Sequence, residues 1–214
     1  YTFIEGTQIQ KLNQESIVSL ASFVANLHKV GLKSHLKREN NMLKTSWNYI
    51  CNKFNDYNGD FSVELKNVTQ EINKIESLFP NNIRVGLIHA DLFKDNIFFN
   101  QHNQVSGIID FFFTCSDSIV YDLATLVNAW FFSNNLFSEM DFQLFIKKYF
   151  ELIKWEDEEK KLFNFYLKAS AIRFFLTRLY DLNFNNRGQV KHKNPIEFYE
   201  ILNFHKKNNL QNFL

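Results

Sequence analysis

Cysteine, proline and glycine are all scarce in this sequence, and each shortage narrows the classes of protein that fit it. The 214 residues include two cysteines, Cys51 and Cys115, which lie far apart and without CxxC or Cys/His spacing. This pattern argues against a disulfide framework and against a zinc site. With two prolines and six glycines, no low-complexity linker divides the chain. We expect one main domain in a reducing cytoplasm.

A surplus of charge of either sign is also missing. Lys and Arg number 24 against 23 Asp and Glu, a formal net charge of +1. Nothing in this balance favours a nucleic-acid or anionic-membrane surface, so a small-molecule partner is expected. No apolar run reaches the roughly 20 residues that a membrane span needs, and residues 1–6 do not resemble a signal peptide. We therefore expect a soluble cytoplasmic protein.

One polar stretch stands out because it lies between two short apolar runs. His89, Asp91 and Asn96 follow the spacing H-x-D-x-x-x-x-N, after Leu87-Ile88 and before residues 97–99. In a kinase-type catalytic loop with this spacing, the Asp accepts a hydroxyl proton and the Asn holds a metal ion. The stretch is predicted to fold as strand, loop and strand.

A second acidic residue, Asp110, lies on the next apolar run. Residues 100–104 form a polar turn between residues 97–99 and residues 105–111, which predicts a β-hairpin. This hairpin would place Asn96 and Asp110 at the same end of its paired strands. Amide and carboxylate oxygens suit Mg²⁺, which keeps several waters and phosphate oxygens among its ligands. The sequence therefore predicts a magnesium site for phosphoryl transfer.

The remaining polar residues of the motif have alternative roles. Asp91 is the candidate catalytic base, because an acceptor hydroxyl has a high pKa and needs a carboxylate within hydrogen-bond reach. Lys94 either approaches the transferred phosphate or is a solvated surface charge. His89 is expected to pack and hydrogen-bond the loop. Asp95 is solvated, braces the loop, or contacts metal or substrate. Asp122 either caps the following helix or accepts backbone N–H groups of the loop.

Helical periodicity accounts for most of the remaining chain. Apolar residues recur at helical spacing from Ser16 onward, with Gly31 in the place of a C-terminal cap. The same spacing predicts helices at 63–79 and, as one long helix, from 156 to 180, while capping signals predict helices at 138–153 and from 195 onward. Helices are also expected at 42–54 and 123–132. The helix at 123–132 is almost wholly apolar and is expected to be buried. The fold class is α+β and mostly helical.

Four segments of this sequence resemble those of a known family. They are HADLFKDN at 89–96, GIIDFFF at 107–113, YDLATLVNAW at 121–130 and AIRFFLTRLYDL at 171–182. They resemble the aminoglycoside phosphotransferase and choline kinase superfamily, which has a protein-kinase-like fold, and most closely its homoserine kinases. The resemblance implies ATP and Mg²⁺, transfer of the γ-phosphate to the hydroxyl of L-homoserine, and a place in threonine biosynthesis. It also implies that Asp91 is the base and that Asn96 and Asp110 bind the metal.

The resemblance extends from about Phe3 to the C-terminus. It implies that Phe3, Ile4 and Glu5 belong to the hinge, at residues 1–6, whose backbone meets adenine. The sequence has no glycine-rich phosphate loop and no upstream lysine strand. We therefore expect residues 1–214 to form the C-terminal catalytic and substrate lobe, with the nucleotide lobe absent or supplied by a complementing chain. Alone, this lobe should be weakly active or inactive and should expose apolar surface near the hinge and hairpin.

The acceptor-binding residues are predicted from chemistry. An amino-acid substrate needs a cation for its carboxylate and an acid for its ammonium group, and four residues are suitable: Arg173, Arg178, Asp117 and Asp181. Residues of these types on a helix are also commonly solvated or paired within the protein. Two other functions remain open: another small-alcohol kinase, of the choline, methylthioribose or aminoglycoside type, and a catalytically inactive remnant.

Overall fold

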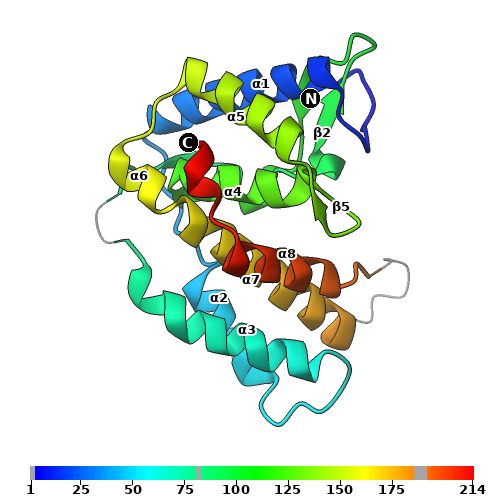
Figure 1. Ribbon diagram of the computed structural model, residues 1–214, viewed down its shortest axis with the longest axis vertical. Coiled ribbons are helices and arrows are strands. Elements are labelled where there is room, and N and C mark those ends of the chain that lie inside the picture. Colours follow the sequence, from blue (N-terminus) through cyan, green and yellow to red (C-terminus); the bar gives the residue numbers. More distant parts are fainter. Residues whose placement is uncertain (1–2, 81–82, 186–191) are drawn as a thin grey trace.

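The chain is mostly helical, and its labelled strands lie in the half of the molecule away from α2 and α3 (Figure 1). The computed structural model describes residues 3–80, 83–185 and 192–214. The α-helices of this part are α1 (Gln14–Leu32), α2 (Lys44–Lys53), α3 (Ser62–Ile75), α4 (Ile119–Trp130), α5 (Glu139–Leu152), α6 (Asp157–Lys161), α7 (Phe163–Phe184) and α8 (Ile196–Lys207). Short 3₁₀ turns are η1 (Glu76–Leu78), η2 (Lys94–Asn96), η3 (Phe111–Phe113) and η4 (Leu210–Phe213). The α+β, mostly helical class is confirmed.

The strands of the described residues form two-stranded antiparallel sheets. They are β1 (Gly86–Ile88), β2 (Ile97–Phe99), β3 (Val105–Ile108), β4 (Cys115–Asp117), β5 (Phe132–Ser133) and β6 (Leu136–Phe137). The pairs are β1 with β4, β2 with β3 and β5 with β6. The β2–β3 pair is the predicted hairpin, whereas the pairing of β1 with β4 was not predicted.

Helix α4 lies at the centre of the molecule (Figure 1). Its residues are buried with the exception of the half-buried Ala129, as expected for a helix that is apolar on all sides. Helix α7 packs against α4 and also contacts α2 and α8, while α1 packs against α5. These contacts enclose one hydrophobic core, which includes Ala90 and Leu92 of the loop between β1 and β2.

The predicted role of Gly31 is wrong. The residue is inside α1, which continues to Leu32 and is capped by Lys33. A Cβ atom on Gly31 would lie 2.0 Å from the carbonyl oxygen of Leu87, closer than any real contact. The glycine is needed because α1 crosses β1 at this point. It thereby sets the position of the strand that leads into the catalytic motif.

Two helix boundaries also differ from the predictions. Helix α4 begins at Ile119, and Ser118 is its N-cap, accepting a hydrogen bond from Val120 N. Asp122 is therefore inside the helix and does not cap it. The long helix predicted from residue 156 is divided at Leu162 into α6 and α7. None of the helices in the described part combines the length and apolar character that a bilayer crossing requires.

Candidate active site

The HxDxxxxN motif forms the connection between β1 and β2. Residue Ile97 is paired with Ile108, and the next amide along, Ile109 N, donates a 3.0 Å hydrogen bond to Asn96 O. Asn96 and Asp110 consequently lie at the same end of the hairpin. The predicted juxtaposition of these two side chains is confirmed, and both line one cavity together with Asp91.

A buried carboxylate in α4 holds the start of the loop. Asp122 accepts hydrogen bonds from His89 N at 3.0 Å and Ala90 N at 2.7 Å, and His28 Nε2 lies 3.3 Å from the same carboxylate. Ala90 has φ 64°, a left-handed conformation that non-glycine residues rarely adopt. The bracing role considered for Asp122 is thus confirmed. Its two hydrogen bonds to the backbone fix a strained residue immediately before Asp91.

The imidazole of His89 joins the loop to the end of the hairpin. Its Nδ1 accepts a 3.2 Å hydrogen bond from Asp91 N, and its Nε2 lies 3.0 Å from Ile109 O. Because Nδ1 accepts a hydrogen bond, the ring proton is on Nε2, and this N–H donates a hydrogen bond to the carbonyl oxygen of Ile109. The ring also packs edge-on against Phe111. This is the packing and hydrogen-bonding role expected for His89.

Asp91 and Asn96 are linked directly. The amide nitrogen of Asn96 donates to Asp91 O at 2.9 Å and to Asp91 Oδ2 at 3.0 Å. Burial raises the pKa of Asp91, against the opposing effects of Arg173, His89 and the Asn96 hydrogen bond. A carboxylate with a raised pKa is a better proton acceptor than an exposed one, which is suitable for a base.

The donor set fits a hard divalent cation. Because Asn96 directs its amide nitrogen toward Asp91, its Oδ1 is left for another partner. Asp110 adds a carboxylate, and both residues supply only oxygen, the donor that Mg²⁺ prefers. Within the described ranges, no group of three or more His, Cys, Asp or Glu side chains could hold a metal ion by itself. A cation here would take its other ligands from water or phosphate.

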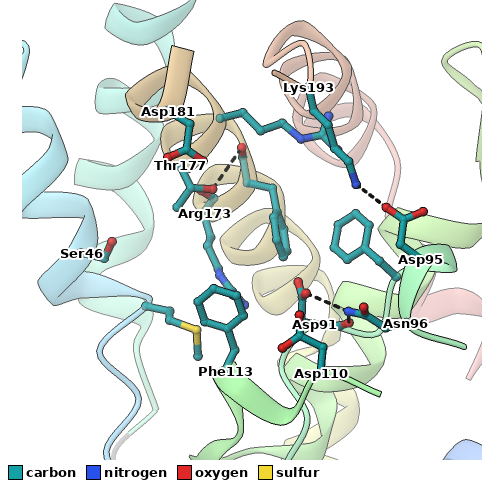
Figure 2. Close-up of a pocket in the computed structure, with 14 residues that line it drawn as sticks. Ser46, Asp91, Asp95, Asn96, Asp110, Phe113, Arg173, Thr177, Asp181 and Lys193 are labelled. Carbon is teal, nitrogen blue, oxygen red and sulfur yellow. Dashed lines mark hydrogen bonds and ion pairs between the residues drawn. The ribbon is translucent and has the colours of Figure 1, made fainter. Parts of the chain in front are cut away.

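The cavity around these residues has a volume of about 490 Å³. Figure 2 shows Asp91, Asn96 and Asp110 at its base, with Asp181 and Lys193 at the opposite end. The lining residues come from the loop, from Asp110 and η3 after the hairpin, from α2 and the residues before it, from α7 and from the segment before α8: Met42, Ser46, Asp91, Phe93, Asp95, Asn96, Asp110, Phe113, Arg173, Phe174, Thr177, Arg178, Asp181 and Lys193. The volume suits a small metabolite.

Three of the predicted acceptor-binding residues line this cavity, and each has a hydrogen-bond partner within the protein, although only the two arginines are buried. Arg173 donates to Ala90 O and to Tyr121 Oη, and it is 2% exposed. Arg178 donates to Glu197 and to the carbonyl of the residue that precedes Pro195. Asp181 is exposed, and Asn185 donates a hydrogen bond to its carboxylate.

Lys94 and Asp117 lie in other cavities. The ammonium group of Lys94 donates to Gln10 O at 3.2 Å and lies 5.9 Å from the centre of the Trp130 ring. Burial lowers the pKa of Lys94. Asp117 accepts a 2.6 Å hydrogen bond from Asn40, and burial raises its pKa. The structure does not bring either residue together with Asp91 in the cavity shown in Figure 2.

The predicted hinge residues contact the hairpin. Thr7 and Phe99 exchange backbone hydrogen bonds of 2.9 Å in both directions. Ile4 packs against Gly107, where a Cβ atom would lie 2.8 Å from its side chain. Phe3 is 85% exposed, and Glu5 is exposed as well; residues 1 and 2 lie outside the described part. Four large apolar residues of the hinge segment and of the stretch after the hairpin are exposed, although exposed apolar side chains occur elsewhere in the described residues as well: Phe3, Ile109, Phe111 and Phe112.

Several residues that line the cavity were not predicted. Lys193 belongs to a polar segment without a recognisable motif, and Ser46 and Thr177 are on helices whose sequences suggest only packing. Phe93 lies inside the HADLFKDN segment and Phe113 ends the GIIDFFF segment, so their positions in the sequence were a usable signal. Lys193 has no such signal, because only the fold brings it close to the loop.

Comparison with known sequences identifies the family. A family model described as phosphotransferase enzyme family matches residues 1–143, more than half of the chain. The chain belongs to this family. The match includes the catalytic loop and the hairpin but ends within α5, before α7, the helix that contributes Arg173, Arg178 and Asp181.

Similar proteins include homoserine kinases. Those of Paramagnetospirillum magneticum and Parvibaculum lavamentivorans are 30% and 33% identical to this chain over 213 and 211 residues, and each alignment covers 96% of it. The chain spans 65% and 64% of the lengths of these two relatives.

Solved structures of phosphotransferases have a similar fold. A choline/ethanolamine kinase family protein from Mesorhizobium loti has a TM-score of 0.65 at 15% identity, covering 90% of this chain and 60% of that one. Amicoumacin kinase has a TM-score of 0.64 at 14% identity, with 94% and 61% covered. At such identities the likeness concerns the fold alone, which is kinase-like.

Proposed function

We propose that this protein transfers the γ-phosphate of ATP, with Mg²⁺, to the side-chain hydroxyl of L-homoserine. The observation that carries the proposal is the convergence of Asp91, Asn96 and Asp110 on one cavity of metabolite size. Family membership supports phosphoryl transfer, and the homoserine kinases among the similar proteins support this acceptor. Residues 1–214 then serve as the catalytic and acceptor-binding lobe, with Phe3, Ile4 and Glu5 in its hinge.

Asp91 is the proposed base. Its carboxylate is partly buried and is oriented by the amide group of Asn96, so it can accept the proton of an acceptor hydroxyl placed in the cavity. The backbone of Ala90, held by Asp122, fixes where this carboxylate points. Positioning of this kind is the main protein contribution to phosphoryl transfer, which involves little covalent chemistry by the enzyme.

Asn96 and Asp110 are the proposed metal ligands. These two residues would hold a Mg²⁺ ion, which would supply positive charge to neutralise the negative charge that develops on the transferred phosphate. In this chain, Asp110 has φ 62° and accepts a hydrogen bond from Phe112 N at 3.3 Å, which orients its carboxylate at the start of η3. The strained backbone directs the side chain toward the cavity at a cost in stability, a feature often found at functional sites.

The acceptor is proposed to bind toward α7. Asp181 lines that end of the cavity and offers a carboxylate for an ammonium group. Arg173 and Arg178 are proposed to shape the wall, since each is already hydrogen-bonded within the protein. A glycine-rich loop over the phosphates is not among the 214 residues, so nucleotide affinity is proposed to depend on another segment or chain.

The experiment is a panel of acceptors offered to the full gene product. ATP consumption would be measured with homoserine, choline, methylthioribose and an aminoglycoside. We expect homoserine to give the highest kcat/KM. A preference for another alcohol would reject homoserine while keeping the reaction class. Absence of Mg-dependent ATP binding and of turnover with every acceptor would favour an inactive remnant.

A further inference from the structure

Three cationic side chains line the cavity, and they differ in how they are engaged. Arg173 is buried against Ala90 and Tyr121, with its guanidinium also over the rings of Phe113 and Phe174, at 5.1 and 4.5 Å from their centres. Releasing it would leave buried polar groups unpaired, which is costly. Arg173 is therefore a fixed part of the wall.

Arg178 is held in a similar way. Its guanidinium donates to Glu197 and to a backbone carbonyl, and it lies 4.4 Å from the centre of the Phe198 ring. These contacts tie α7 to the start of α8. A substrate carboxylate would have to displace them to bind Arg178, at the expense of the packing between the two helices.

Lys193 is engaged differently. Its ammonium group pairs with Asp95 Oδ2 at 2.6 Å, and the two side chains are 57% and 58% exposed. Exposed ion pairs contribute little to stability, so their partners exchange at low cost. The ammonium also lies 5.6 Å from the centre of the Phe93 ring, which keeps it at the cavity. Of the three cations, Lys193 can bind an incoming carboxylate at the lowest cost in free energy, because only an exposed ion pair has to be displaced.

We propose that Lys193 binds the α-carboxylate of an amino-acid acceptor, exchanging Asp95 for the substrate, while Asp181 binds the α-ammonium group. Asp95 is then an internal competitor that occupies Lys193 when the cavity is empty. Figure 2 shows Lys193 extending toward Asp95 across the end of the cavity, with Asp181 on the neighbouring helix. This assignment rests on the proposed phosphoryl transfer to an amino-acid hydroxyl and adds how the acceptor is recognised.

The residue that the substrate would displace from Lys193 belongs to the catalytic loop. Asp95 belongs to η2, between Asp91 and Asn96, and among the described residues its carboxylate is paired with Lys193 alone. The substrate and Asp95 therefore compete for one cation. Removing Lys193 should weaken substrate binding, whereas removing the charge of Asp95 should strengthen it. A purely structural ion pair predicts the same sign for both changes.

The test compares three acceptors in the full gene product. L-homoserine has both charged groups, propanolamine lacks the carboxylate, and γ-hydroxybutyrate lacks the ammonium group. We expect Lys193→Met to raise the KM for homoserine and γ-hydroxybutyrate about tenfold, and to leave the KM for propanolamine within about twofold of wild type. Asp95→Asn should lower the KM for homoserine about two- to fivefold. Lys206→Met, an exposed lysine on α8, is the matched control and should change nothing.

The outcomes separate this assignment from the proposed function. If the wild-type protein phosphorylates homoserine but Lys193→Met raises the KM of all three acceptors equally, or of none, the carboxylate assignment is overturned and the homoserine kinase activity stands. The same holds if Asp95→Asn raises the KM for homoserine. If the wild type does not phosphorylate homoserine at all, the proposed function fails, and this assignment fails with it.

Discussion

Replacing Asp122 by asparagine tests the account of how the loop is held. The Oδ2 atom accepts from His89 N and lies near His28 Nε2, while Oδ1 accepts from Ala90 N. An asparagine retains one oxygen, which can still accept from Ala90. Its amide nitrogen would then face two donors instead of accepting from them, and the side chain would no longer carry charge.

The expected loss is large because the site is fully buried. Asp122 and His28 are both 0% exposed, so water cannot replace the lost contacts. A hydrogen bond to a charged group contributes about 1.5–3 kcal/mol, and a buried donor left unsatisfied costs about 1–3 kcal/mol. With two donors affected, we expect Asp122→Asn to lower the free energy of unfolding by about 3–5 kcal/mol.

This loss should depend on pH. Burial would raise the pKa of Asp122, but the hydrogen bond and charge of His28, with further help from His89, hold it below its ordinary value of 3.8. The stabilisation from the carboxylate is therefore complete above pH 3.8 and is lost as the pH falls through the lower folded-state pKa. The difference between wild type and Asp122→Asn should be constant near neutrality and shrink below about pH 4.

Urea denaturation followed by tryptophan fluorescence, between pH 7 and pH 3, measures this difference. Asp157→Asn is the control, because that carboxylate is 87% exposed, and it should change stability by less than about 0.5 kcal/mol. A loss of under about 1 kcal/mol at pH 7 for Asp122→Asn would refute the reasoning. So would a loss that stays the same at every pH.

Three further changes have defined outcomes. Gly31→Ala places a Cβ atom 2.0 Å from Leu87 O, so α1 must move from β1, and thermal melts should show a loss of roughly 1–3 kcal/mol; an unchanged Tm would contradict the close approach. Burial lowers the pKa of His205 from 6.5 to about 3, so only the unfolded chain gains that proton between these values; His205→Gln should reduce the loss of stability there in acid titrations. Arg173→Met leaves Ala90 O unpaired and should lower kcat in the full gene product far more than it changes the KM for ATP; equal changes would argue against loop positioning.

The parts of the fold that were predictable depend on local pattern. The hairpin followed from a polar turn between two apolar runs, and it brought Asn96 and Asp110 together as expected. Helices α1 and α3 followed from apolar spacing of 3.6 residues. These features are determined by residues close in sequence, where periodicity is informative.

Other features depend on contacts between distant residues, which periodicity does not encode. The need for glycine at Gly31 comes from the carbonyl of Leu87, and the pairing of β1 with β4 joins strands separated by the whole hairpin. Lys94 seemed suitable because it is inside the loop, yet its ammonium group lies beside Gln10. Lys193, which is distant in sequence, lines the cavity instead.

The most direct test of the central claim is phosphorus NMR of the full gene product with ATP, Mg²⁺ and L-homoserine. We expect a phosphate monoester resonance that requires Mg²⁺ and whose rate of appearance falls about 10²–10⁴-fold in Asp91→Asn. Asp157→Asn, which alters an exposed carboxylate outside the cavity, should keep the rate at saturating homoserine. A monoester that forms equally fast in Asp91→Asn, or no monoester from homoserine in the wild type, would contradict the account.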